Sequence, residues 1–383
     1  MSPTAKLEYT QATAIRYKRL RKELRGFLLD HYCEVTGYNR KYAIMKLNHC
    51  HIKKYKRKPG RPSLYNQEFV VKPLCTIWRA SERPCSVRLK VILQEWMPFM
   101  DPQIHPAVKR ILLKISPATI DRVLRPYRLG DNRRRHCRTK PGKLIKSRIP
   151  IRQNQWDEKR PGFLEADTVA HCGSTLLGEF VNTIDTVDIA SGWTEQRAVF
   201  GKSKHQVVDQ IQDIEQSLPF PLRGFDADNG NEFLNYTLMK YFTVRREDPV
   251  QFTRSRPYHK NDNAHIEQKN WTHVRYWFGY YRFDRPEVVP LFNDLYKNEW
   301  RLYHNFFLPS VKLLSKHRVG SRWVKKHDAP QTPFRRLMRS RRVPLHIKRS
   351  LLHQFQQLNP FELKAQINGK LKHIFQQNKM PVK

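Results

Sequence analysis

The chain has 383 residues, and its 72 Lys and Arg outnumber 34 Asp and Glu to give a formal net charge of +38. In a compact chain, so many positive charges repel one another, which predicts a polyanionic partner that we expect to be nucleic acid. A ribosomal or other RNA-associated protein would have the same composition. No run approaches ~18 uncharged apolar residues and the start lacks a signal-peptide core, so we expect a cytosolic or nuclear protein without a membrane span. Six cysteines without a C-x-x-C pair argue against a zinc finger.

Residues 1–50 predict a compact helical module. Apolar residues recur at helical spacing between positions 27 and 35, Gly37 ends that helix, and Asn39 is suited to cap the next one, residues 40–47. Three basic side chains lie off the apolar face of this second helix and are candidate DNA contacts: Arg40, Lys41 and Lys46. Helix, glycine turn and basic helix is the plan of a helix-turn-helix, although an ordinary αα-hairpin shows the same pattern.

Residues 51–64 form a basic linker. Its centre, KPGRP at residues 58–62, resembles an AT-hook, in which an extended segment lies in the minor groove. Narrow A·T-rich grooves have an enhanced negative potential that attracts Arg, so Arg61 is the expected contact. A charged linker without a groove contact would have the same composition.

Residues 65–128 predict a second helical module, and residues 129–160 a second basic linker. Helices are expected near 67–80, 85–98 and 104–114, followed by one that starts at Pro117 after Ser116 as its N-cap. The last helix would bury three apolar residues: Ile120, Val123 and Leu124. This pattern indicates a second helix-turn-helix, with Thr119 and Arg122 as candidate DNA contacts.

Residues 161–308 change to a mixed α/β pattern. Strands are predicted at residues 162–171, 179–188, 194–200, 222–227 and 249–253, and helices at residues 204–218, 232–242 and from 263 through 277. Three strands followed by alternating helices and strands is the order of a ribonuclease-H-like fold, which other α/β folds share in part. The predicted fold class is therefore multidomain, with all-α helix-turn-helix modules before a ribonuclease-H-like core and a small basic region after it.

Three acids of this core are predicted to meet. Asp167 lies in the first strand, Asp228 just beyond the fourth, and Glu267 in the first turns of the long helix. The first and fourth strands are neighbours in such a sheet, and the helix would bring Glu267 against them. Three carboxylates at one point cannot all stay ionised without a cation, which predicts a site for two Mg²⁺ ions.

Two motifs around these acids resemble a known family. DNGNEF at residues 228–233 resembles the DNG-x-EF motif of bacterial insertion-sequence transposases and retroviral integrases, and KNDNAHIEQKN at residues 260–270 resembles their glutamate motif. The separation of 38 residues between Asp228 and Glu267 is close to that of the family. The resemblance covers about residues 160–305, and Asp262-Asn263, where many relatives carry Gly, leaves the subfamily open.

The resemblance implies a DDE transposase with a retroviral-integrase-type catalytic core. In that family the equivalents of Asp167, Asp228 and Glu267 hold two Mg²⁺ or Mn²⁺ ions, cleave the ends of a mobile DNA element and join the freed 3′-OH ends to target DNA. The implied partners are the double-stranded DNA of both ends and target, with self-association on that DNA, in a prokaryotic cytoplasm near the nucleoid. Three basic residues around the motif are candidate DNA contacts: Lys260, Lys269 and Arg275.

Other polar residues of the core are predicted to be structural. Glu165, Asp185 and Asp188 alternate with apolar residues, so we expect solvated or salt-bridged surface positions, and the register of the motif favours Asp228 over Asp226. His171 and His265 are interpreted as structural histidines. Four residues continue the long helix at core spacing and are expected to pack: Trp271, Val274, Trp277 and Phe278.

Residues 309–383 stay basic and predict a small DNA-binding or assembly region whose fold the sequence does not reveal. Two other classes of protein remain open. A non-catalytic DNA-binding regulator would explain the charge and both helical modules but not the three acids. A ribonuclease-H-type nuclease would explain the acids and the metal but leaves the two front modules without a role.

Overall fold

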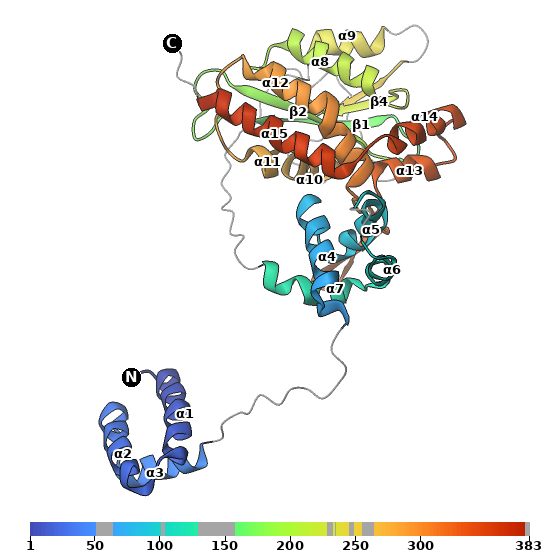
Figure 1. Ribbon diagram of the computed structural model, residues 1–383. Coiled ribbons are helices and arrows are strands. Elements are labelled where there is room, and N and C mark those ends of the chain that lie inside the picture. Colours follow the sequence, from blue (N-terminus) through green and yellow to red (C-terminus); the bar gives the residue numbers. More distant parts are fainter. Residues whose placement is uncertain are drawn as a thin grey trace. The chain divides into compact units, whose positions relative to one another are not determined.

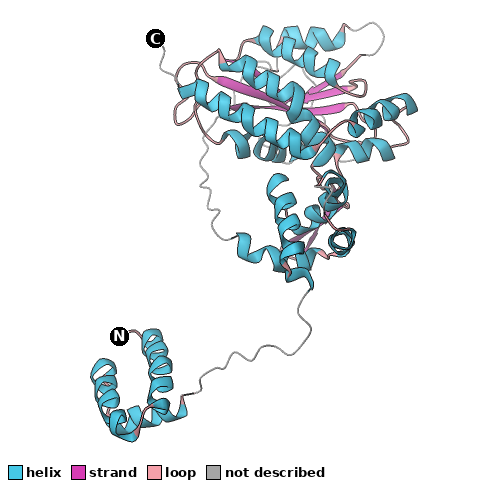
Figure 2. Cartoon of the chain, viewed as in Figure 1, coloured by secondary structure: helices cyan, strands magenta, loops and turns pink. Residues whose placement is uncertain are grey.

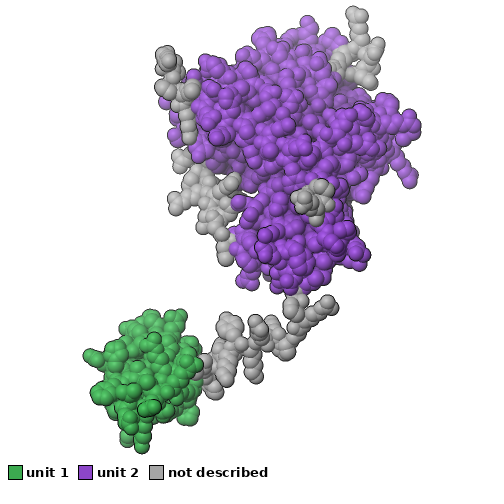
Figure 3. Space-filling view, in the orientation of Figure 1, with its two compact units in different colours: residues 1–62 green, residues 63–383 purple. Residues whose placement is uncertain are grey.

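The structure, a computed structural model, describes residues 1–50, 64–100, 104–128, 158–227, 233, 235–244, 249–254 and 264–379. The chain forms two compact units, Met1–Pro62 and Ser63–Lys383, which Figure 3 distinguishes by colour. Several predicted site residues lie outside the described residues: Arg61, Asp228 and Lys260. None of the helices in the described part of the chain has the length and apolar character needed to cross a membrane.

The described part of the first unit, residues 1–50, forms three helices (Figure 1): α1 (Pro3–Arg19), α2 (Lys22–Thr36) and α3 (Arg40–His49). The predicted break and cap are confirmed: Gly37 takes a left-handed φ of 73°, and the Asn39 Oδ1 accepts a hydrogen bond from the Tyr42 N–H at 2.8 Å. The core of the unit consists of six residues: Ala14, Tyr17, Leu29, Tyr32, Ala43 and Leu47. Of the apolar stretch in α2, Phe27 is 78% exposed, so only part of that stretch faces the core.

The second unit begins with a helical module. It contains α4 (Glu68–Ala80), α5 (Ser86–Trp96), α6 (Pro106–Lys114) and α7 (Pro117–Leu124), with 3-10 turns at Leu64–Asn66, Met97–Phe99 and Arg125–Arg128. The predicted N-cap of the last helix is confirmed, since the Ser116 Oγ accepts a hydrogen bond from the Thr119 N–H at 3.2 Å. The stripe that we expected to be buried on α7 is also confirmed, and it packs against α5.

A mixed five-stranded sheet follows, with the order β3-β2-β1-β4-β5. Its strands are β1 (Phe163–Ala170), β2 (Val181–Asp188), β3 (Thr194–Phe200), β4 (Gly224–Ala227) and β5 (Gln251–Arg254). β1, β2 and β3 run antiparallel to their neighbours, whereas β4 is parallel to both β1 and β5. The prediction that the first and fourth strands are neighbours is confirmed, and the sheet is consistent with a ribonuclease-H-like core.

Helices cover both faces of this sheet (Figure 2). On one face, α8 (Lys204–Ser217) and α9 (Tyr236–Thr243) pack on apolar residues that include Leu164, Ala166 and Phe225. The other face carries α10 (Ala264–Lys269), the π-helical segment Asn270–Arg275, α11 (Tyr276–Phe278) and α12 (Val288–Leu295). The predicted long helix is therefore present, but its middle turn is π-helical, a distortion that often marks functional sites.

The C-terminal region does not form a separate unit. After π-helical segments at Tyr296–Trp300 and Tyr303–Phe307 come the hairpin β6 (Leu313–Val319) and β7 (Arg322–His327), then α13 (Pro333–Arg339), α14 (Leu345–Gln356) and α15 (Pro360–Lys379). Helix α15 packs along α12 (Figure 1), and Phe355 stacks on Phe334 with ring centroids 4.8 Å apart. The division that we predicted at residue 308 thus falls inside the second unit, because aromatic residues on both sides of it share one core.

The helical module of residues 64–128 also docks on the core. The Trp96 Nε1–H donates a hydrogen bond to the Phe307 carbonyl at 3.2 Å, and Arg335 and Glu95 form an ion pair at 2.7 Å. These contacts differ from the expectation of a separate DNA-binding module, since they fix α5 against the segment that follows the sheet.

Candidate active site

Four carboxylates lie on one face of the sheet, the face that α10 covers. Asp167 is opposite Asp185 in the β1–β2 ladder, and Glu165 is opposite Asp226 in the β1–β4 ladder. Because side chains alternate along a strand, Glu165 and Asp167 point to the same side. Apolar residues at the intervening positions face α8 and α9 instead. Three buried acids, Glu165, Asp185 and Asp226, therefore share one surface with the half-buried Asp167.

The helix that carries Glu267 is fastened to this surface on both sides of that residue. The Ile266 N–H donates a hydrogen bond to the Glu165 Oε2 at 3.1 Å. The Asn270 Nδ2 donates a hydrogen bond to the Asp167 Oδ2 at 2.6 Å. Residues 266 and 270 are one helical turn apart, so these two contacts hold the turn that contains residue 267 over β1.

The Asp185 carboxyl is buried beside Asp167. Burial raises the pKa of Asp185 to about 7, and the negative charge of Asp167 raises it further, whereas the Gln196 hydrogen bond and the Lys269 ammonium lower it. The Gln196 Nε2 donates to the Asp185 Oδ1 at 2.8 Å, and the Asp185 Oδ2 has no hydrogen-bond partner among the described residues. A neighbourhood that disfavours further negative charge is one that a divalent cation would stabilise, so these residues fit a Mg²⁺ site.

The structure describes only part of the predicted triad. Asp167 has a described side chain, only the backbone of Glu267 is described, and Asp228 lies outside the described residues. Ala227, the residue before Asp228, pairs with Ala166 of β1. The backbone therefore brings residue 227 beside Asp167. Among the described residues, no cluster of three or more His, Cys, Asp and Glu side chains is arranged to hold a metal.

The prediction that Glu165, Asp185 and Asp188 are solvated or salt-bridged surface residues is wrong. All three are at most 1% exposed, because helices cover both faces of the sheet. Asp188 ties the β2–β3 turn to β1: its carboxylate accepts hydrogen bonds from the Ser191 N–H at 2.7 Å and the Gly162 N–H at 2.8 Å. Polar and apolar residues alternate in the same way in a strand with one solvent-exposed face and in a strand with helices on both faces.

His171 is structural, as predicted. It is fully buried, its Nε2 is hydrogen-bonded to the Thr183 hydroxyl at 2.8 Å, and three aromatic rings surround it: Phe278, Phe283 and Phe292. Burial lowers the pKa of His171 to about 3, and the nearby Arg275 guanidinium lowers it further. Arg275 itself donates a hydrogen bond to the Ala170 carbonyl at 2.8 Å, so the backbone of β1 already engages this candidate DNA contact.

Lys269 lines a cavity instead of projecting freely into solvent. Its side chain is partly exposed, and burial lowers the pKa of the ammonium to about 7, an effect that Asp185 opposes and Arg88 reinforces. Sequence reasoning missed three residues near it: Asn270, Arg88 and His304. Asn270 could have been found, since it follows Glu267 by three positions and so shares its helix face. Arg88 and His304 reach the site through docking of distant segments, for which the local sequence has no signal.

The candidate DNA contacts of the two helical modules lie on accessible faces. Arg40 and Lys41 are exposed at the start of α3, where Arg40 pairs with Asp30, while Lys46 lies over the Tyr42 ring. On α7 the exposed Arg122 donates a hydrogen bond to the Thr119 Oγ1 at 3.1 Å. Helices α3 and α7 therefore both present basic side chains to solvent, and on α3 the exposed Tyr42 and Met45 lie among them.

The chain has a relative among known proteins. The chain is 33% identical over 344 residues to the uncharacterized protein y4rM of Sinorhizobium fredii, which covers 88% of this chain and 96% of that protein. The chain belongs to the same family as that protein. No family model matches the chain.

Among solved structures, the chain is similar to a chain from the simian T-cell lymphotropic virus intasome in complex with PP2A regulatory subunit B56 gamma. The two share 15% sequence identity with a TM-score of 0.30, over 52% of this chain and 63% of that one.

Proposed function

We propose that this protein is a DDE transposase, which cleaves the ends of a mobile DNA element and joins them to target DNA. The observation that carries the proposal is the fastening of α10 to β1, where Ile266 and Asn270 bond Glu165 and Asp167 on a face rich in carboxylates. This arrangement supports a meeting of Asp167 and Glu267. Asp228 would join them from the residue after β4, the strand next to β1.

In this proposal Asp167, Asp228 and Glu267 would hold two Mg²⁺ or Mn²⁺ ions. Such ions, when bound, activate the attacking oxygen and stabilise the leaving oxygen of a phosphoryl transfer. Asn270 keeps the Asp167 carboxylate in one orientation through its 2.6 Å hydrogen bond. Burial raises the pKa of Asp185 to about 7 in the metal-free protein, and positive charge entering the site would lower it.

The remainder of the chain would bind double-stranded DNA. The two helical modules would present α3 and α7 to the major groove. The β6–β7 hairpin adds a second kind of contact, since neither strand contains an acid and four of its basic residues are exposed: Arg318, Arg322, Lys325 and Lys326. A two-stranded ribbon fits the major groove, and phosphates would relieve the repulsion among its cations.

The test is a joining assay on the DNA that flanks the gene, with labelled ends and Mg²⁺. Asp167→Ala, Asp228→Ala and Glu267→Ala should each abolish cleavage and joining and leave DNA binding largely intact, because each removes a metal ligand and not a phosphate contact. Asp209→Ala, at an exposed acid of α8, is the matched control and should retain activity. Full joining by any triad variant would reject the assignment, and cleavage without joining by the unaltered protein would favour a ribonuclease-H-type nuclease.

A further inference from the structure

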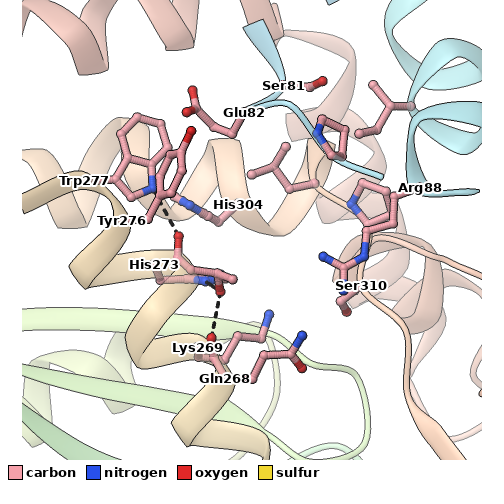
Figure 4. A pocket seen from close by; sticks show the side chains of 15 residues that line it. Ser81, Glu82, Arg88, Gln268, Lys269, His273, Tyr276, Trp277, His304 and Ser310 are labelled. Atoms are coloured by element: carbon pink, nitrogen blue, oxygen red, sulfur yellow. Dashed lines mark hydrogen bonds between the residues drawn. The ribbon is translucent and has the colours of Figure 1, made fainter. Parts of the chain in front are cut away.

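A cavity of about 130 Å³ lies between the helical module and the helix that carries Glu267. One wall comes from the turn after α4 and the start of α5, and the other from residues 268–277 (Figure 4). Six residues give the cavity its chemistry: Arg88, Lys269, His273, Tyr276, Trp277 and His304. Figure 4 shows Lys269 and Arg88 on opposite sides of the hollow with their nitrogen-bearing ends turned toward each other.

The lining of this cavity carries more positive than negative charge, although Asp185, which lies outside the lining, acts on Lys269. Within the part of the chain that the structure describes, neither Arg88 nor Lys269 has a hydrogen-bond or ion-pair partner. The acid in the lining, Glu82, is already paired with Lys364. Both side chains are partly exposed and converge on one hollow, where an anion between them would offset their mutual repulsion.

A buried histidine in the lining has one ring nitrogen without a hydrogen-bond partner among the described residues. His304 is 2% exposed, and its Nδ1 donates a hydrogen bond to the Trp300 carbonyl at 3.0 Å. Its Nε2 has no hydrogen-bond partner among the described residues. The His273 ring lies beside it at a centroid distance of 4.3 Å, and the His273 Nδ1 is hydrogen-bonded to Thr272 at 2.8 Å. With its proton on Nδ1, the neutral ring presents a lone pair at Nε2, which can accept a hydrogen bond from a water molecule in the cavity and does not itself donate to a phosphate.

We propose that this cavity binds one phosphate group of the DNA backbone, with Arg88 and Lys269 as its principal contacts. The inference rests on the proposed function, because it assumes that DNA reaches the carboxylate face. The guanidinium of Arg88 matches the geometry of a phosphate, and the Lys269 ammonium adds a compact charge. Since a water molecule occupies about 30 Å³, the cavity has room for a phosphate and bound water.

Such a site would set the position of a DNA strand relative to the candidate catalytic acids. Lys269 is next to Asn270, which holds the Asp167 carboxylate. Arg88 belongs to α5, which docks on the core through Trp96. A phosphate between Arg88 and Lys269 would therefore join the helical module to the helix of the active site, and DNA binding would tighten that interface.

The first test uses the full chain and inorganic phosphate as the probe. Lysines are labelled with pyridoxal 5′-phosphate and borohydride, and peptides are quantified by mass spectrometry in phosphate or chloride buffers of equal ionic strength. Phosphate should protect Lys269 and not the exposed Lys114 of α6.

Arg88→Gln should raise the phosphate concentration for half-protection about tenfold, as expected for the loss of one charged hydrogen bond. Arg110→Gln, at an exposed arginine of α6, should leave it unchanged. Equal protection in Arg88→Gln and the unaltered chain would overturn the proposal.

The second test measures DNA affinity against salt concentration by fluorescence anisotropy. Each lost phosphate contact reduces the slope of log affinity against log salt by about one, so Arg88→Gln should show this loss and Arg110→Gln should not. An unchanged slope in Arg88→Gln, with cleavage intact in the unaltered protein, would refute this site and leave the proposed function standing. Protection of Lys269 and a reduced slope without any metal-dependent cleavage would support the site and refute the transposase.

Discussion

His171 is neutral because its surroundings are aromatic and closed. Its pKa of about 3 in the folded chain lies below the 6.5 of an unburied histidine, so the unfolded chain binds more protons between these values. The stability that neutral His171 contributes is present above pH 6.5 and is lost as the pH falls through that window. In urea unfolding at a series of pH values, the contribution of His171 to the free energy of unfolding should therefore fall below about pH 6.5, whereas the raised pKa of Asp185 acts in the opposite direction over the same window.

Replacement of His171 measures how much of the pH dependence of stability comes from this residue. His171→Gln can keep a hydrogen bond to Thr183 but carries no titratable group, so its stability should depend less steeply on pH. The dependence should not vanish, because burial also lowers the pKa values of His273 and His304. His317→Gln, at an exposed histidine, is the control and should leave the pH profile unchanged. An identical profile for His171→Gln and the unaltered chain would contradict the argument.

Asn270 is expected to act through Asp167 as a positioning residue. Loss of a partner that orients a metal ligand typically lowers metal affinity or activity about 10–100-fold. Asn270→Ala should therefore raise the Mg²⁺ concentration for half-maximal cleavage, and saturating Mg²⁺ should restore part of the rate. Asn298→Ala, whose exposed amide bonds only Asp294, is the matched control. An unaltered Mg²⁺ dependence in Asn270→Ala would show that Asp167 needs no such support.

Sequence rules for single residues, such as helix capping, predicted the structure correctly where the hydrogen-bond partner is near in sequence. The caps by Asn39 and Ser116 depend on backbone groups three residues away, and both are present. The burial of Asp185 and Glu165 was not predicted, because it depends on α10, roughly a hundred residues further along the chain. The cavity residues Arg88 and His304 were missed for the same reason.

Among the elements, α15 contains a glycine that nothing in its surroundings requires. A Cβ at Gly369 would meet no atom within 4 Å, and the residue does not have a positive φ. Glycine in a helix interior costs about 0.5–1 kcal/mol relative to alanine, so Gly369→Ala should raise the free energy of unfolding by about that amount.

Gly320 provides the matched comparison. It also has open space around its Cα, but its φ is +59°, where a side chain is strained. Gly320→Ala should therefore leave stability unchanged or lower it, and the difference between the two variants isolates the backbone contribution. Urea unfolding of both variants measures the effect, and stabilisation of equal size in each would contradict it.

The β6–β7 hairpin is an element that we expect to contact the DNA backbone in addition to α3 and α7. Lys325→Gln should reduce the slope of log affinity against log salt by about one, since one phosphate contact is lost. Lys372→Gln removes an exposed charge from α15 and should change the slope less. Equal slopes for both variants would show that the hairpin is merely one part of a diffuse basic surface.

The sequence predicted β-strands and most helices well, because each has its own hydrophobic period. Strand β3 matches its predicted range of 194–200, and α8 ends one residue before its predicted end. Helix α1 was not singled out, since three of its four buried residues are Thr10, Thr13 and Ala14, which carry little hydrophobic signal. The turn from α-helix to π-helix at Asn270 was also missed, because the period of apolar residues hardly changes there.

At the scale of the whole molecule, the sequence suggested more divisions than the structure contains. The predicted boundaries follow changes in composition, whereas the second unit is held together by aromatic residues from distant segments. Trp96 of the helical module contacts Phe307 and Phe361 edge-on, at centroid distances of 6.3 and 5.1 Å. Contacts across more than two hundred residues leave no trace in local composition, so the docking could not be predicted.

The net charge of +38 is a property of the whole molecule, and we expect it to oppose self-association of the free protein. Two free chains repel each other at low salt, whereas DNA neutralises the charge and releases condensed counterions. Concerted joining of two DNA ends, which the proposed function requires, needs more than one active site. The free protein should therefore be monomeric or weakly associated, and end DNA should drive a dimer or larger complex. Light scattering with and without end DNA, at low and high salt, measures the change. A joining-competent complex with a single chain per pair of ends would contradict this expectation, and so would a stable dimer of free protein at low salt.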